Sequence, residues 1–318
     1  MIIEAPSQLV YDETSVVVVT CSYYEENRFA IQRLGYVPME NLFYYEDFYI
    51  LYDLYVNNYL RSKRVDVSLT EKCTLKCKKC NMFMTHFSNP KHQPLEVVLQ
   101  DLDAYFAVVD YVKVLNLLGG EPFLYPDLDK VLDYIAEHYR NRIERVIIFT
   151  NGTLLPKQNL VESIKKCKAT VQFSDYTAIV PYQERMQQFK DLAEKESIDN
   201  YTMASEEWGD FGFPENPNCI ESDKDAICFF ERCKAPFRGI WKKRVYFCHL
   251  ETSAIRAGLF EDESNDYFDL ALMDKNLIKK QYCEFDYGYN KKGFITFCKV
   301  CRGCECVNNL TVPVAEQL

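Results

Sequence analysis

The sequence predicts an α/β fold in which helices connect the strands of a parallel sheet. Between residues 64 and 204, short β-branched runs alternate with stretches whose apolar residues recur at helical spacing. Polar motifs directly follow several of these runs, as expected where a site lies at the carboxyl ends of parallel strands. The chain also has 14 cysteines in 318 residues, and most of them fall into two groups. These three observations predict a parallel sheet that carries a metal or iron–sulfur site.

Composition narrows the class of protein. The formal net charge is −10 and no block of basic residues occurs, so a nucleic-acid partner is not expected. No apolar run approaches the 18 residues of a membrane span, and the first twenty residues lack a secretion signal. We therefore expect a cytoplasmic protein without a membrane partner. Because the cytoplasm keeps thiols reduced, clustered cysteines indicate metal or iron–sulfur cluster ligation rather than disulfides.

Residues 1–63 are predicted to form a separate N-terminal piece of the structure. A β-branched run at 15–20 predicts a buried strand, and residues 24–34 predict a helix that ends before Gly35. Another strand or the start of a helix follows at 42–45. The order predicts a small Rossmann-like β-α-β piece. Because no G-x-G-x-x-G occurs, a structural or partner-docking role is favoured over nucleotide binding.

The alternation that follows predicts one domain over residues 64–215. Its strands are expected at 64–70, 112–118, 145–150, 170–173 and 200–204. Its helices are expected at 94–111, 127–140, 157–168 and 183–195. Strands joined in this way by helices form a parallel sheet with crossover connections.

Directly after the first of these strands, Cys73, Cys77 and Cys80 form the pattern C-x3-C-x2-C. Three thiolates on one loop can hold three irons of a [4Fe–4S] cube. No fourth cysteine lies nearby, so one iron stays open, as in metal sites that bind a reactant. The alternatives are a zinc site, or cysteines that share no ligand.

The motif resembles the radical S-adenosylmethionine (SAM) enzymes. The resemblance implies a partial (β/α)6 barrel, SAM on the open iron, and a 5′-deoxyadenosyl radical formed by reductive cleavage of SAM. It also implies that the GGEP segment at 119–122 and the polar ends of the next two strands contact SAM. The residues assigned in this way are Gly119, Gly120, Glu121, Thr150, Asn151 and Ser174. For each of them ordinary turn chemistry is the alternative.

Residues 216–318 predict a small third domain. Its cysteines are Cys219, Cys228, Cys233, Cys248, Cys283, Cys298, Cys301, Cys304 and Cys306. A hairpin predicted at 238–247 is flanked by Cys233 and Cys248, and Cys298 and Cys301 form a C-x2-C pair. This resembles the twitch domain, a short relative of the SPASM auxiliary-cluster domain. The four cysteines are the expected ligands of one auxiliary [4Fe–4S] cluster.

Three alternatives stay open for that domain. Zinc could occupy the same four thiols. Cys228, Cys304 or Cys306 could replace one of them, because Cys301 and Cys304 have the same spacing as the chosen pair. A second auxiliary cluster is the third alternative.

The architecture resembles twitch-bearing aminocyclitol dehydrogenases, which implies oxidation of a carbohydrate-like substrate more than epimerisation. An oxidation needs a proton acceptor, and Tyr176, Arg185 and Asp210 are the candidates. The resemblance also implies an external electron donor such as a flavodoxin or ferredoxin. A peptide maturase is the alternative among enzymes, and a non-catalytic iron–sulfur scaffold or electron carrier is the alternative outside them.

Overall fold

The structure, a computed structural model, describes residues 9–21, 24–233, 237–262, 266–271, 277–304 and 307–318. The chain divides into two compact units, Met1–Arg61 and Ser62–Leu318. Among the described helices, none combines the length and the apolar character that crossing a lipid bilayer requires.

The first unit has the predicted β-α-β order. Strand β1 (Val17–Val19) pairs in parallel with β2 (Leu42–Tyr44), and helix α1 (Tyr24–Gln32) lies between them in the chain. Helix α2 (Tyr45–Asn57) follows β2 directly, so the ambiguous start at 42–45 is a strand and then a helix. The small core consists of Val19, Ile31, Tyr36 and Leu42.

In the described part of the second unit, eight strands form one sheet in the order β11-β10-β9-β3-β4-β5-β6-β7. Their bounds are β3 (Arg61–Thr70), β4 (Tyr111–Gly119), β5 (Ile143–Thr150), β6 (Ala169–Asp175), β7 (Asn200–Ala204), β9 (Gly239–Trp241), β10 (Arg244–Tyr246) and β11 (Tyr267–Asp269). Strands β4 to β7 pair in parallel, and β9 pairs in parallel with β3. Strand β10 is antiparallel to both of its neighbours. The predicted α/β class is confirmed.

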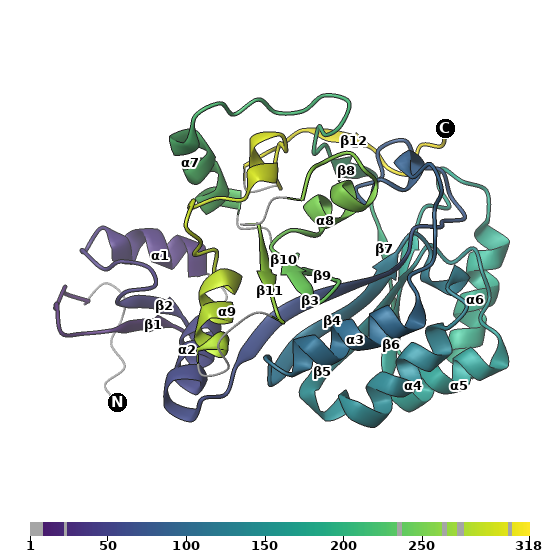
Figure 1. Ribbon diagram of the computed structural model, residues 1–318, viewed down its shortest axis with the longest axis horizontal. Coiled ribbons are helices and arrows are strands. Elements are labelled where there is room, and N and C mark those ends of the chain that lie inside the picture. The colour runs from purple at the N-terminus through teal and green to yellow at the C-terminus, as the bar shows by residue number, and fades with distance from the viewer. Residues whose placement is uncertain (1–8, 22–23, 234–236, 263–265, 272–276, 305–306) are drawn as a thin grey trace. The chain divides into compact units, whose positions relative to one another are not determined.

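Four helices connect the parallel strands and lie together along one side of the sheet (Figure 1). They are α3 (Leu95–Phe106), α4 (Leu128–His138), α5 (Gln158–Cys167) and α6 (Gln183–Lys195). In α4 the spacing i, i+3, i+4, i+7 places Leu128, Val131, Leu132 and Ile135 on one buried face. The parallel strands with their connecting helices form the predicted partial barrel, and the polar residues after β4, β5 and β6 lie at the carboxyl ends of these strands.

The remaining elements include three further helices, α7 (Asp223–Cys233), α8 (His249–Arg256) and α9 (Ile278–Asp286). Strand β8 (Glu207–Gly209) pairs antiparallel with β12 (Thr311–Pro313) in a small second sheet. The predicted hairpin at 238–247 is confirmed as β9 and β10.

Strands from both sides of residue 215 share the large sheet, because β9, β10 and β11 extend it beyond β3. The division into functional domains at 1–63, 64–215 and 216–318 stays a prediction.

Candidate functional site

The cysteine loop follows strand β3 and is held by a small apolar cluster. The cluster consists of Leu75, Cys77, Val314 and Ala315, with Cys73, Cys80, Tyr176, Val180 and Trp208 packed against it. Burial raises the pKa of Cys73 to about 12, and the charges of Glu121 and of the two neighbouring thiols act in the same direction. Burial also raises the pKa of Cys77 and of Cys80. The structure thus brings the three predicted thiols together.

Of the two glycines of the GGEP segment, Gly119 packs on the end of β3 and Gly120 on the start of this loop. Gly120 donates its N–H to Thr70 O (2.8 Å), and Glu121 donates its N–H to Lys72 O (2.8 Å). A Cβ atom on Gly120 would lie 2.1 Å from Lys72 O, and Gly119 has a positive φ of 147°. Only glycine fits this close approach of two backbones. The segment therefore packs against the backbone at the start of the cysteine loop.

Glu121 is fully buried, and its carboxylate accepts hydrogen bonds from the chain itself. Thr150 Oγ1 donates to Oε1 over 2.8 Å, and the backbone N–H of Asn151 donates to Oε2 over 2.8 Å. The N–H of Phe123 donates to Oε1 over 3.0 Å. Burial nevertheless outweighs these donors and raises the pKa of Glu121 to about 7. The side chain joins the end of β4 to the end of β5.

Asn151 continues this connection to the cysteine loop. Its Nδ2 donates to Thr74 Oγ1 over 2.9 Å and lies 3.7 Å from Cys73 Sγ. Its Oδ1 accepts from the backbone N–H of Thr153 over 3.0 Å. Because both ends of the amide are engaged, the side chain is fixed beside the first cysteine.

The predicted proton acceptors lie in different surroundings. Tyr176 is half-buried beside the cysteine loop, and burial raises the pKa of its hydroxyl. Asp210 forms an ion pair with Arg302 near Cys80. Arg185 is exposed on α6 and contacts Gln188. Ser174, the last predicted SAM contact, is half-buried near Tyr176.

A second group of thiols surrounds a cavity near helices α7 and α8. Its cysteines are Cys233, Cys248, Cys298, Cys301 and Cys304, and its other walls are Phe229, Phe230, Phe247, Leu250, Ile295, Phe297 and Gly303. The four predicted auxiliary ligands are thus brought together, and Cys304 joins them. Cys219 and Cys228 are exposed, and Cys306 lies outside the described residues.

The model of the Radical SAM superfamily matches residues 67–176. These residues contain the cysteine loop, the GGEP segment and the polar ends of β5 and β6. This chain carries a radical SAM domain. Its cofactors are SAM and a [4Fe–4S] cluster.

Among known proteins, the chain is similar to GTP 3′,8-cyclase from Helicobacter pylori (strain HPAG1), at 33% identity over 32% of this chain and 30% of that protein. It is also similar to GTP 3′,8-cyclase from Aliarcobacter butzleri (strain RM4018), at 26% identity over 70% of this chain and 69% of that protein. The match to the Helicobacter protein thus spans less than a third of that relative's length.

Among solved structures, BtrN in complex with AdoMet and 2-DOIA has the same fold, with a TM-score of 0.51. The two sequences are 16% identical over 81% of this chain and 97% of BtrN.

The donor set of the radical SAM domain fits a cluster. Among the described residues, no three His, Cys, Asp or Glu side chains converge on one metal ion. In a [4Fe–4S] cluster each cysteine bonds a different iron, so its ligands surround a cube rather than a point. The neighbouring thiols of Cys73, Cys77 and Cys80 could hold three corners of such a cube.

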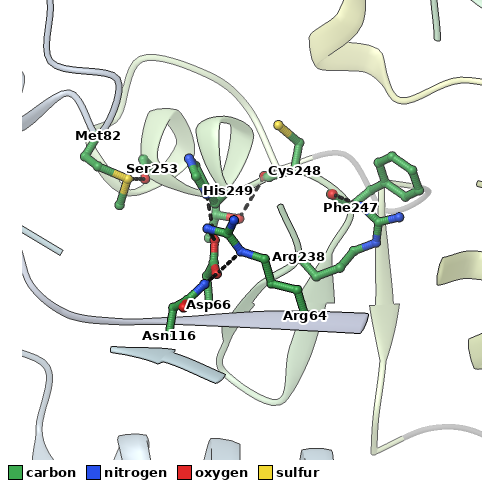
Figure 2. Close-up of polar contacts among 10 residues, drawn as sticks. Arg64, Asp66, Met82, Asn116, Arg238, Phe247, Cys248, His249 and Ser253 are labelled. Atoms are coloured by element: carbon green, nitrogen blue, oxygen red, sulfur yellow. Dashed lines mark hydrogen bonds and ion pairs between the residues drawn. The ribbon is translucent and has the colours of Figure 1, made fainter. Parts of the chain in front are cut away.

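A buried polar network that the sequence analysis missed joins the radical SAM domain to helix α8 (Figure 2). Asp66 on β3 is 1% exposed, and its carboxylate lies 2.8 Å from His249 Nδ1. Arg64 Nε donates to it over 2.7 Å and Asn116 Nδ2 over 2.6 Å. Although burial alone would raise the pKa of Asp66, the His249 and Arg64 partners hold it below its usual value.

One signal in the sequence points to this network. Asp66 stands between two valines in a strand predicted to be buried, and a buried charge requires partners. The sequence does not show which partners these are, because His249 lies 183 residues further along the chain.

Proposed function

We propose that this protein is a radical SAM enzyme that removes a hydrogen atom from a carbon of a sugar-like small molecule, with dehydrogenation favoured over epimerisation. The observation that carries the proposal is that one compact unit holds two groups of thiols. One lies on the loop after β3 and the other surrounds an apolar cavity.

When bound, SAM and the cluster supply a 5′-deoxyadenosyl radical by one-electron cleavage of SAM. Cys73, Cys77 and Cys80 would hold that cluster. Gly119, Gly120, Thr150, Asn151 and Ser174 are proposed as SAM contacts. The burial of Glu121 and its bonds to the ends of β4 and β5 favour a role in holding these contacts in place.

Cys233, Cys248, Cys298 and Cys301 are proposed as ligands of one auxiliary [4Fe–4S] cluster, in a twitch-like domain. When bound, such a cluster supplies an electron acceptor for the oxidation of a substrate. The phenylalanine walls of the cavity support this role, because apolar surroundings keep water from the site. Cys304 lines the same cavity and is the alternative fourth ligand.

Oxidation of an alcohol also releases a proton from its oxygen, which a side chain must accept. Of the three candidates, Tyr176 packs beside the cysteine loop, but its raised pKa keeps the hydroxyl protonated, so it would have to pass a proton on rather than hold it. Asp210 would have to leave its ion pair with Arg302, and Arg185 lies exposed on α6. The physiological electron donor is proposed to be an external protein such as a flavodoxin or ferredoxin.

A sugar-like substrate is supported by the resemblance of the architecture to aminocyclitol dehydrogenases. A second candidate is cyclisation of GTP, because relatives at 33% and 26% identity are named GTP 3′,8-cyclase. A peptide substrate remains the third alternative.

The test is anaerobic reconstitution, followed by incubation with SAM, dithionite and a panel of substrates deuterated at carbon. We expect about eight irons per chain from two clusters. Aminocyclitols and sugar derivatives should transfer deuterium to 5′-deoxyadenosine. Transfer from GTP or from a peptide instead would contradict the sugar proposal.

The matched variants are Cys77→Ala and, as a control, Cys21→Ala, whose thiol is exposed. Cys77→Ala should abolish formation of 5′-deoxyadenosine and keep about four irons in the auxiliary cluster. Cys21→Ala should behave as the parent does. Cleavage of SAM by Cys77→Ala would contradict the assignment of the cysteine loop.

A further inference from the structure

Residues 314–318 lie against the cysteine loop as an extra strand would. Cys77 and Gln317 form an antiparallel bridge, Lys78 donates its N–H to Glu316 O (2.8 Å), and Leu318 donates its N–H to Lys76 O (2.9 Å). Val314 and Ala315 are buried against Leu75 and Cys77. A segment more than 230 residues away in the sequence is therefore part of the cluster's surroundings.

Within this segment the amide of Gln317 contacts a cluster ligand. Its Nε2 lies 3.3 Å from Cys77 Sγ, and it also donates to Ala315 O over 2.6 Å. Its Oε1 accepts the backbone N–H of Lys76 over 2.8 Å. A backbone N–H can only donate, so the atom facing Lys76 must be oxygen. The NH2 group of Gln317 must therefore point at the sulfur.

The other two ligands receive different donors. The Asn151 amide is 3.7 Å from Cys73 Sγ and also donates to Thr74 over 2.9 Å. Cys80 interacts with backbone N–H groups that follow it in the same loop. Cys77 thus has a side-chain donor that is closer than that of Cys73, and it comes from a distant segment.

We propose that Gln317 is a positioning residue that sets the reduction potential of the cluster held by Cys73, Cys77 and Cys80. Reduction adds negative charge to the cluster and its sulfur ligands. A hydrogen-bond donor at a ligand sulfur stabilises the reduced form more than the oxidised form, and so raises the potential. Gln317 makes the cluster easier to reduce. This inference depends on the cluster and not on the proposed substrate.

Two variants separate this role from simple support of the loop. Gln317→Glu keeps the length and an oxygen for the Lys76 N–H, but replaces the donor by an acceptor. Gln317→Met removes the donor without adding charge. A hydrogen bond to a charged group contributes enough to change an equilibrium constant about tenfold. For one electron that corresponds to a potential lower by about 59 mV.

The potential is measured by an anaerobic redox titration followed by electron paramagnetic resonance, on the signal that changes when SAM is added. The control is Glu316→Gln, which removes the exposed ion pair with Lys78 but makes no contact with sulfur. Both Gln317 variants should titrate at a lower potential than the parent, and the control should shift by less than either.

An unchanged potential in Gln317→Met, with iron retained, would overturn the proposal even if Gln317→Glu shifts, because the added carboxylate lowers the potential by its charge alone. So would a loss of the cluster in both variants, because Gln317 would then support the loop rather than tune it. If the parent protein forms no cluster at these cysteines, the cofactor assignment fails instead, and iron analysis of Cys77→Ala distinguishes that case.

Discussion

The carboxylate of Glu121 accepts the backbone N–H of Asn151 over 2.8 Å, so two motifs that end different strands are bonded to one another. The GGEP segment ends β4 and the Asn-Gly turn ends β5. Thr150 donates to the same carboxylate, and Asn151 in turn reaches Thr74 and Cys73. A continuous chain of hydrogen bonds therefore runs from a buried acid to the thiol of Cys73.

The first prediction concerns this acid. Glu121→Gln puts an NH2 group against a backbone N–H or the Thr150 hydroxyl hydrogen, whichever way the amide turns. The loss of one buried hydrogen bond should lower the free energy of unfolding by about 1–3 kcal/mol. We also expect slower formation of 5′-deoxyadenosine, because Asn151 loses its support, while most of the iron at Cys73, Cys77 and Cys80 is retained.

Thermal unfolding and single-turnover cleavage of SAM measure these two effects. Glu162→Gln on α5 is the control, because Glu162 is exposed and should change the stability by less than about 0.5 kcal/mol. A Glu121→Gln protein as stable as the parent would show that the carboxylate is not a structural group.

Much of this region could be predicted from local sequence. Periodicity located the strands and helices of the partial barrel, because burial gives residues 146–149 of β5 a continuous apolar run. Glu121 and Asn151, at the ends of these strands, were both expected to contact SAM, but their contact with one another was not predicted. Glycine was expected to admit a ligand, whereas Gly120 also admits the backbone of Lys72.

The contacts between distant segments could not be predicted in this way. Gln317 meets Cys77 across 240 residues, and His249 meets Asp66 across 183. Neither contact has a local pattern, because each depends on how the chain after residue 206 returns to the sheet. The spacing of the cysteines likewise does not show which of the five thiols that line one cavity are cluster ligands.

The second prediction concerns that choice. Cys298 is almost fully buried among the other thiols, whose charges add to burial in raising its pKa. Cys304 is less buried. We expect Cys298→Ser to lose about four irons per chain and Cys304→Ser to lose none. Iron analysis and the absorbance of the reconstituted variants decide this, and the opposite result would make Cys304 a ligand.

The third prediction concerns Asp66 and His249. Asp66→Asn removes the buried charge that Arg64 and His249 face, and it leaves Arg64, Asn116 and His249 with one carbonyl oxygen in place of two carboxylate oxygens. We expect a loss of about 2–3 kcal/mol in the free energy of unfolding. Because His249 adjoins Cys248, we also expect weaker retention of auxiliary iron than of the iron on the loop after β3.

Anaerobic thermal unfolding and iron release at raised temperature measure these effects. The exposed Asp191→Asn variant on α6 is the control and should match the parent. Equal rates of iron loss from both sites in Asp66→Asn would contradict a specific link between this pair and the auxiliary site.

The fourth prediction concerns the hairpin beside that site. Its two-residue turn places Lys242 at φ 53° and Lys243 at φ 59°, a left-handed conformation that usually selects Asn and Gly. Asp101 on α3 stabilises this turn, because its carboxylate accepts the N–H of Lys242 over 3.1 Å and that of Lys243 over 2.5 Å. Burial nevertheless dominates and raises the pKa of Asp101 from 3.8 to about 6.

The sign of the pH dependence follows from that shift. Between about pH 4 and pH 6 the folded protein binds a proton at Asp101 that the unfolded chain has released, so this contribution to stability falls as the pH rises. The difference of about 2 pKa units corresponds to roughly 3 kcal/mol. Asp101→Asn should therefore lose less stability than the parent between pH 4 and pH 6.5.

Hydrogen exchange at the amides of β9 and β10, measured across this range, reports the effect locally. Glu96→Gln on the same helix is the control, because Glu96 is exposed, and its pH profile should follow that of the parent. If Asp101→Asn and the parent lose protection in parallel as the pH rises, Asp101 does not titrate in this window. The carboxylate would then cap the turn as a fixed charge.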